Sequence, residues 1–420
     1  MLEKYFVRPQ TVDRIRASWI GAEVERYVGW LDGHGYAARC VLWRVPLAVA
    51  FGEFARTRGA RTVEELPEHV EPFVAGWVAA RHRHRRVGGR PSAREVRGPI
   101  EQMLTVVVPG FVGSGRSHRP EPFVDTLPAF FEYLVAERGL RPASLRNYEH
   151  HLRHFENYLA RIGAELGEVS PPILSAFIAD RAVAGLARTT LRDGCGVLRV
   201  FLRYAHREGV LRSDLSAVME WPQAYRLSDI PRSITWSEVR DVLAGVDRRS
   251  PAGKRDYAIL LLLVSYGLRG REVAALTLDD IDWKRERLAV PERKAGHSTA
   301  FPLSATVGEA IIDYLRHGRP KTDSRRVFFR AVAPVEPIGP AAVSARARHY
   351  LLKAGVPVVR PGSHTLRHTC VQRLVEADFS LKTIGDFVGH RSAKSTEIYA
   401  KVAVESLREV ALGDGEEVLA

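Results

Sequence analysis

Two histidines and an arginine stand close together in the stretch His364-Thr-Leu-Arg-His368. On a helix, residues four apart share one face, so His364 and His368 would present both imidazoles together. Such a pair can bind zinc, but zinc needs further ligands, and no glutamate follows His364 as in the HExxH motif. Arg367 suits different chemistry, because a guanidinium binds phosphate oxygens through two parallel N–H groups. The stretch alone leaves a metal site and an anion site open, with His368 the better candidate for a packed structural histidine.

Two other residues could also bind an anion or take part in catalysis. Arg269 follows the apolar run 257–264 and precedes Glu272 by three residues. Because buried arginines are rare unless paired with a carboxylate or phosphate, Arg269 is predicted to bind one of these. Lys294 stands out since only nine of the 62 basic residues are lysine. A lysine in a turn is ordinarily solvated, but it can donate a proton near neutral pH when its pKa is lowered, which arginine cannot do.

The last part of this set is Gly389-His390, followed nine residues later by Tyr399. A lone tyrosine near a C-terminus is ordinarily a core or surface residue. Together with the residues described above, Tyr399 is a candidate oxygen nucleophile. The arginines and histidines supply hydrogen-bond donors for an anion, and the lysine supplies a proton. The sequence has no GxxxxGK[ST] element, so it predicts no P-loop.

In order and spacing, these residues resemble the catalytic domain of the tyrosine recombinases, the phage-integrase family of site-specific DNA recombinases. The shared motifs are GLRxxE at Gly267–Glu272, a lysine in a β-hairpin, HxLRH, a GH element and a tyrosine soon after. The resemblance covers about residues 232–412 and departs at Asp378, where the family usually has glycine in the helix after HxLRH. It implies that the catalytic residues are Arg269, Lys294, His364, Arg367, His390 and Tyr399, with Glu272 and His368 in supporting roles.

The resemblance also implies a reaction and its partners. Tyr399 would cleave a DNA strand through a covalent 3′-phosphotyrosyl intermediate, without metal or ATP as cofactors. The partner would be double-stranded DNA carrying specific recombination sites, bound by a homo-tetramer or together with other recombinases. Two alternatives share the fold: a type IB-like DNA topoisomerase and a catalytically idle DNA-binding regulator. The complete set of six residues disfavours the regulator, and the duplicated helical units described below favour recombination over relaxation.

Composition is consistent with such a partner. The 420 residues carry a net charge of +13 and are 45% hydrophobic, which predicts a folded protein with a polyanionic ligand. Three scattered cysteines form no CxxC pair, and no apolar run approaches the roughly 20 residues that span a bilayer. We expect a cytoplasmic protein, associated with the nucleoid when bound to DNA.

The first half of the chain contains an internal repeat. At a constant offset of 104, the segment 24–78 aligns with 128–182, including Gly35 with Gly139, Phe51 with Phe155 and Gly59-Ala60 with Gly163-Ala164. Each copy reads as helix, short loop, helix, a Gly-Ala break and another helix. The second copy resembles the core-binding domain of the family, and the first resembles it again. The extra copy favours a transposon- or phage-borne element.

The fold class expected is mainly α with a small antiparallel β-sheet, the catalytic domain being preceded by helical core-binding-type domains. Strands are predicted at 287–291 and 299–303, a helix start at Thr235, and helices from about 305 onward. The predicted layout is an N-terminal helical (SAM-like, core-binding-like) DNA-binding domain at 1–110, a linker at 111–121, a core-binding domain at 122–222, a linker at 223–231 and the catalytic domain at 232–420. The DNA-binding candidates are Arg81, Arg83, Arg85, Arg86, Arg146, Arg188 and Arg192.

Overall fold

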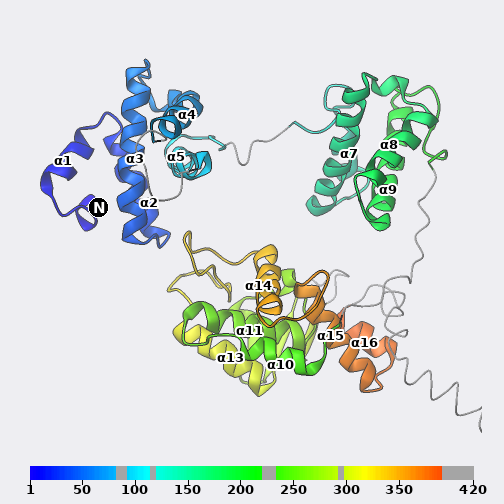
Figure 1. Cartoon of the computed structure of the whole chain (residues 1–420). Coiled ribbons are helices and arrows are strands. Elements are labelled where there is room, and N and C mark those ends of the chain that lie inside the picture. The colour runs from blue at the N-terminus through cyan, green and yellow to red at the C-terminus, as the bar shows by residue number, and fades with distance from the viewer. Residues whose placement is uncertain (82–91, 114–119, 220–232, 292–297, 390–420) are drawn as a thin grey trace, which may run out of the picture. The chain divides into compact units, whose positions relative to one another are not determined.

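The computed structural model describes residues 1–81, 92–113, 120–219, 233–291 and 298–389 (Figure 1). One compact unit spans Arg116–Asp229, and the other combines Met1–Gly115 with Ile230–Ala420. Within the described residues the protein is mainly helical with one three-stranded antiparallel sheet, which confirms the predicted fold class.

The first helical segment buries a core rich in aromatic and branched side chains, among them Tyr27, Phe51 and Ile100, which are all 0% exposed. Helix α5 begins with a capping box, in which Ser92 and Glu95 satisfy each other's backbone N–H groups. Its helices are α1 (Pro9–Ala17), α2 (Gly21–Gly33), α3 (Ala38–Thr57), α4 (Val70–Arg81) and α5 (Ala93–Val107), with short 3₁₀ turns at Leu2–Lys4 and Val63–His69.

The second helical segment repeats this order, as the sequence offset suggests. Gly35 and Gly139 both have positive φ before the longest helix of their copy, and Gly59 and Gly163 both have positive φ after it. Glycine adopts this left-handed conformation without steric penalty, so the same chain reversals recur in both copies. The helices are α6 (Phe130–Ala136), α7 (Pro142–Ile162), α8 (Pro171–Val183) and α9 (Arg188–Arg207), with a 3₁₀ turn at Leu166–Glu168; α7 and α8 both pack against α9 (Figure 1).

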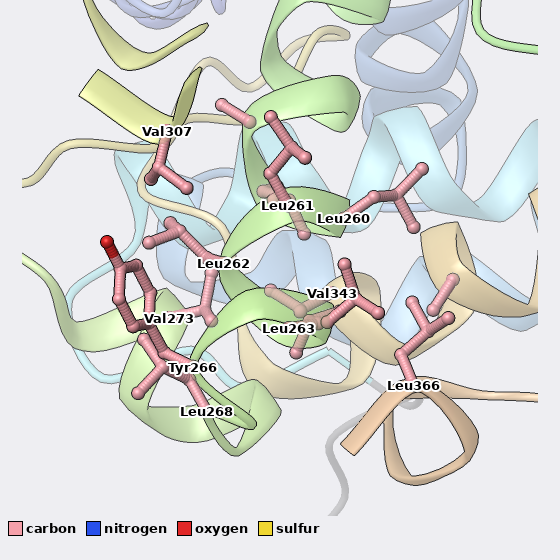
Figure 2. Packing of buried hydrophobic residues seen from close by; sticks show 14 of the residues in the cluster. Leu260, Leu261, Leu262, Leu263, Tyr266, Leu268, Val273, Val307, Val343 and Leu366 are labelled. Carbon is pink, nitrogen blue, oxygen red and sulfur yellow. The ribbon is translucent and has the colours of Figure 1, made fainter. Parts of the chain in front are cut away.

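The C-terminal segment is built around one central, almost fully buried helix. Helix α11 carries Leu260–Leu263 in its middle, and Figure 2 shows these side chains packed among residues of the surrounding elements, including Val307, Val343 and Leu366. A helix that is apolar all round must be covered on every side, which explains its central position. The helices are α10 (Trp236–Ala244), α11 (Pro251–Ser265), α12 (Gly270–Ala275), α13 (Ala305–His317), α14 (Pro340–Lys353), α15 (Ser363–Glu376) and α16 (Leu381–Val388). The predicted start of α10 is confirmed, since Thr235 and Glu238 form a capping box.

The sheet has strand order β1–β2–β3, with β1 at Ile281–Asp282, β2 at Arg287–Val290 and β3 at Thr299–Pro302. Strands β2 and β3 pair antiparallel with Leu288 opposite Phe301, and their bounds agree with the predicted strands to within one residue. The sequence did not predict β1, because two residues carry no detectable alternation. Lys294 lies between β2 and β3, outside the described residues.

Two local expectations were wrong. Residues 318–339 are not helical but form turns and isolated bridges, because prolines at 320, 334 and 337 remove the N–H groups that a helix requires. Asp378 does not lie inside a helix but follows the end of α15 with φ 57°. That left-handed conformation explains why glycine is usual there.

A buried polar network joins the central helix to its neighbours. Arg255 donates two hydrogen bonds to Asp256 Oδ1, at 2.8 and 2.6 Å, and a third to the carbonyl of Phe329 at 2.9 Å. The hydroxyl of Tyr350, on α14, donates to Asp256 Oδ2 at 3.2 Å. Every member of the network therefore has a partner, which buried charges require.

Candidate active site

Arg269 stands at the turn between α11 and α12, directly before the first helical residue Gly270. Its side chain is 17% exposed, and its Nη1 donates to Glu272 Oε1 at 2.9 Å. The other carboxylate oxygen of Glu272 accepts the backbone N–H of Arg269 at 2.8 Å, so one buried carboxylate orients both parts of the arginine. Of the two kinds of partner that the sequence left open for Arg269, a carboxylate or a phosphate, the structure shows the carboxylate of Glu272.

Arg367 lies on α15 and is 4% exposed. Its guanidinium donates to two backbone carbonyls, those of Gly267 and Val388, the second at 2.7 Å. These carbonyls hold the side chain in one orientation without neutralising its charge, which a carboxylate would do.

The two arginines meet at the C-terminal end of α16. Arg269 Nη2 donates to the carbonyl of Gly389 at 2.9 Å, next to the Val388 carbonyl that binds Arg367. Gly389 ends α16 in the left-handed conformation with φ 66°, which turns these carbonyls out of the helix. Arg269 is paired with a carboxylate, whereas the two carbonyls that hold Arg367 carry no negative charge, so this part of the site is suited to an anion.

Gly267 contributes through its backbone alone. Its φ is +58°, and a Cβ at this position would lie 3.1 Å from Val388 Cγ1 and 3.3 Å from Cys370 Sγ. Glycine therefore allows the chain to turn while its carbonyl faces Arg367. Cys370 is buried, and this burial raises the pKa of its thiol to about 12, so it remains protonated and inert.

His364, near the N-terminal end of α15, completes the described part of the site. Although the residue is exposed overall, the surrounding protein removes part of the water around its imidazole, and this desolvation lowers its pKa. The positive charges of Arg367 and Arg269 lower it further. The ring is therefore neutral near pH 7 and can accept a proton.

The metal interpretation of the two histidines gains no support from the described residues. The ring centroids of His364 and His368 are 6.4 Å apart, and among the residues with defined positions no group of three or more histidine, cysteine, aspartate or glutamate side chains has metal-binding geometry. The same residues include no helix that combines the length and the apolar character needed to cross a membrane.

The other sequence candidates divide into two groups. Lys294, His390 and Tyr399 lie outside the described residues, as do Arg83, Arg85 and Arg86 and the side chain of Arg81 at the end of α4. Arg146 on α7 and Arg188 and Arg192 on α9 are exposed. The functional groups that the sequence did not reveal are the carbonyls of Gly267, Val388 and Gly389, because a backbone carbonyl has no residue-specific signal.

Comparisons with known proteins identify the family. Residues 232–406 match the phage integrase family, and residues 127–209 match the phage integrase N-terminal SAM-like domain. The protein y4rA of Sinorhizobium fredii (strain NBRC 101917 / NGR234), named as an integrase/recombinase, is 32% identical over 415 residues, which cover 97% of this chain and 98% of that protein. Tyrosine recombinase XerC of Mycobacterium sp. (strain JLS) is 30% identical over 68% of this chain and 96% of its own length.

The structure of a lambda integrase tetramer bound to a Holliday junction has the same fold, with a TM-score of 0.52 and 19% identity over 76% of this chain and 90% of that one. The chain therefore belongs to the tyrosine recombinase, or phage integrase, family. It is a site-specific integrase/recombinase, an enzyme that binds DNA and transfers DNA strands.

Proposed function

We propose that Arg269, Arg367 and His364 form the phosphate-binding wall of a DNA-cleaving site that Lys294, His390 and Tyr399 complete. The observation that carries the proposal is the convergence of both guanidiniums on the end of α16, directly before His390 in the chain. Arg269 and Arg367 bind the two non-bridging oxygens of the scissile phosphate and stabilise the charge that grows as phosphorus becomes five-coordinate. His364 and His390 add hydrogen bonds to the same oxygens.

In the chemical step, the phenol oxygen of Tyr399 attacks phosphorus and the bond from phosphorus to the 5′-oxygen breaks. Lys294 protonates the departing 5′-oxygen, and the neutral imidazole of His364 accepts the phenol proton. The product is a 3′-phosphotyrosyl ester and a free 5′-hydroxyl. The ester conserves the energy of the phosphodiester, so a 5′-hydroxyl from a partner strand restores Tyr399 and joins the strands without ATP.

The three segments each have a hydrophobic core of their own, which supports assigning each a separate role in DNA binding. Residues 122–222 bind the duplex as the core-binding domain, through the exposed Arg146, Arg188 and Arg192, while residues 232–420 bind it around the scissile phosphate. Contacts of this kind go to phosphates and set the register on DNA without reading bases.

The first helical domain, residues 1–110, contacts DNA differently. At the repeat offset of 104, Arg146 corresponds to Leu42, which is 44% exposed, and the next residue, Trp43, is 45% exposed. The position that corresponds to Arg146 is therefore apolar, and the DNA contact of the first domain is assigned to Arg81, Arg83, Arg85 and Arg86 instead. The presence of this extra domain favours a recombinase that acts on a transposon- or phage-borne element.

The active assembly is a homo-tetramer on two DNA sites. An apolar groove beside α10, α11 and α15 is lined by side chains that include Trp236, Leu261, Leu374 and Phe379, with Arg373 at the same groove. Residues 404–412 (VESLREVAL) have apolar side chains at helical spacing and acidic residues at 405 and 409 that complement Arg373. This segment of a neighbouring copy fills the groove. Deleting residues 404–420 removes tetramers on DNA in native gels; persistence of tetramers would contradict this assignment.

The central test is covalent trapping on DNA duplexes that tile the sequence flanking the gene. Each duplex carries a nick a few nucleotides from the candidate scissile phosphate, so the released strand diffuses away and the ester persists. We expect a protein–DNA adduct that survives denaturation and disappears in Tyr399→Phe, while filter binding is retained. An adduct that persists in the variant would refute the assignment of Tyr399. Relaxation of a plasmid without paired-site products would identify a topoisomerase, and binding without any adduct an idle regulator.

A further inference from the structure

The first described residues after the 220–232 segment are attached directly to the helix that carries His364 and Arg367. The backbone N–H of Ile234 donates to Thr369 Oγ1 on α15 at 3.0 Å. Ile234 is 7% exposed and Thr369 is 3% exposed, so this hydrogen bond is shielded from water. Apolar packing alone would attach a chain segment less specifically, because it does not determine the position of one backbone group.

The hydroxyl of Thr369 uses both of its hydrogen-bonding roles. It accepts from Ile234 and donates to the carbonyl of Thr365, one turn earlier on α15, at 3.0 Å. Because the donor direction is occupied, the lone pair that receives the Ile234 N–H is oriented. The contact therefore requires a hydroxyl group at this position, in this orientation.

A second contact lies one helical turn further along α15. The guanidinium of Arg373 is 4.0 Å from the ring centroid of Trp236, the first residue of α10. Residues 369 and 373 are four apart and so share a face of α15. We call the Ile234–Thr369 hydrogen bond and the Trp236–Arg373 stack the linker contact.

The linker contact is adjacent to the catalytic arginine in sequence. Thr369 follows Arg367 by two residues on one rigid helix, and the buried guanidinium of Arg367 is already held by two backbone carbonyls. A shift of α15 by a fraction of an ångström would therefore displace Arg367 from those carbonyls or strain the helix. Reaction rates respond steeply to such displacements.

We propose that Thr369 and Arg373 are positioning residues: through Ile234 and Trp236 they fix the start of the catalytic segment against α15, and so hold Arg367 in the orientation that cleavage requires. This inference rests on the proposed cleavage function.

The test measures single-turnover adduct formation by the full-length chain at saturating suicide duplex. Thr369→Val keeps the shape but removes the hydroxyl, so the Ile234 N–H loses its acceptor, and cleavage slows about tenfold. Thr369→Ser keeps the hydroxyl and stays within about twofold of the parent. Arg373→Gln, at an exposed position, slows cleavage about two- to threefold, and Arg373→Lys, which keeps the cation, restores it.

A double-mutant cycle separates positioning of Arg367 from simple stabilisation. Arg367→Lys by itself slows cleavage, because it loses the planar pair of donors that binds phosphate. Thr369→Val has no further effect in that background, because the residue through which Thr369 acts is already impaired. Multiplicative effects, or cleavage by Thr369→Val at the parental rate in a sample shown folded by thermal melting, would overturn the proposal. Absence of any adduct in the parent and in Thr369→Ser would instead overturn the proposed function.

Discussion

Replacing Glu272 by glutamine tests how the site orients Arg269. The carboxylate accepts two hydrogen bonds, from the backbone N–H of Arg269 at 2.8 Å and from its Nη1 at 2.9 Å. Glutamine keeps the shape but offers one carbonyl oxygen, so one of these donors would face the amide NH₂ group instead. The substitution therefore removes a charge-assisted hydrogen bond and creates a donor–donor contact.

The magnitude follows from burial. The side chain of Glu272 is 3% exposed and that of Arg269 is 17% exposed, so water replaces little of the lost interaction. Hydrogen bonds to charged groups contribute about 1.5–3 kcal/mol, and Arg269 keeps its bond to the Gly389 carbonyl at 2.9 Å. We expect a loss of about 1.5–2.5 kcal/mol of transition-state stabilisation, or roughly 10- to 50-fold in single-turnover cleavage. DNA affinity does not fall, because the change removes a negative charge beside the phosphate.

The assay compares cleavage rate at saturating DNA with the dissociation constant measured by filter binding. Glu95→Gln is the matched control, since Glu95 occupies the same capping position in α5, where its carboxylate accepts the N–H of Ser92 at 2.9 Å. It has no arginine of the site as a partner, so cleavage should stay within about twofold. Parental cleavage by Glu272→Gln, or an equal loss in both variants, would refute the reasoning.

Three further outcomes are expected. Gly267→Ala lowers stability by about 1–2 kcal/mol in urea unfolding and slows cleavage, because φ is +58° and the added Cβ meets Val388 at 3.1 Å; a neutral effect on both would contradict the role of this carbonyl. Asp256→Asn lowers the free energy of unfolding by about 3–5 kcal/mol, because it leaves the buried Arg255 without its counter-charge. Tyr350→Phe lowers it by about 1 kcal/mol, because it removes one hydrogen bond to Asp256. Equal losses in the two variants would contradict this ranking. The pKa of His364 is lowered from 6.5 in the folded protein, chiefly by desolvation, so the unfolded chain binds protons more readily and stability falls as the pH drops below that value. His364→Asn should therefore reduce this loss of stability in urea titrations between about pH 7 and pH 5. An unchanged dependence of stability on pH would show that His364 does not titrate as inferred.

Local features of the fold were predictable from the sequence because they depend on neighbouring residues. The apolar stripe of α7, with Leu152, Phe155 and Leu159 buried, follows from helical periodicity. The start of α10 follows from Thr235 and Glu238, and the β2–β3 pair from two short runs around a polar turn. Residues 318–339 were wrongly predicted to be helical, although the prolines at 320, 334 and 337 were visible in the sequence.

For the site, the sequence determined which side chains are available and in what order. The spacing of Arg269 and Glu272 was enough to identify the carboxylate as one of two possible partners of the arginine, because both residues lie on the same short segment. The family motifs then distinguished a phosphate site from a metal site, which His364 and His368 alone could not do.

Only the tertiary structure decided what holds the two arginines. Arg367 donates to the carbonyl of Gly267, a hundred positions away in sequence, and Arg269 to that of Gly389, 120 positions away. Backbone carbonyls are present at every residue, so no pattern of side chains marks the ones that become acceptors. The same reason applies to the bond from Ile234 to Thr369. The sequence by itself determined which side chains are available for the chemistry and where the local helices and strands form. The packing of α11, α15 and α16 decided which backbone carbonyls orient the two arginines.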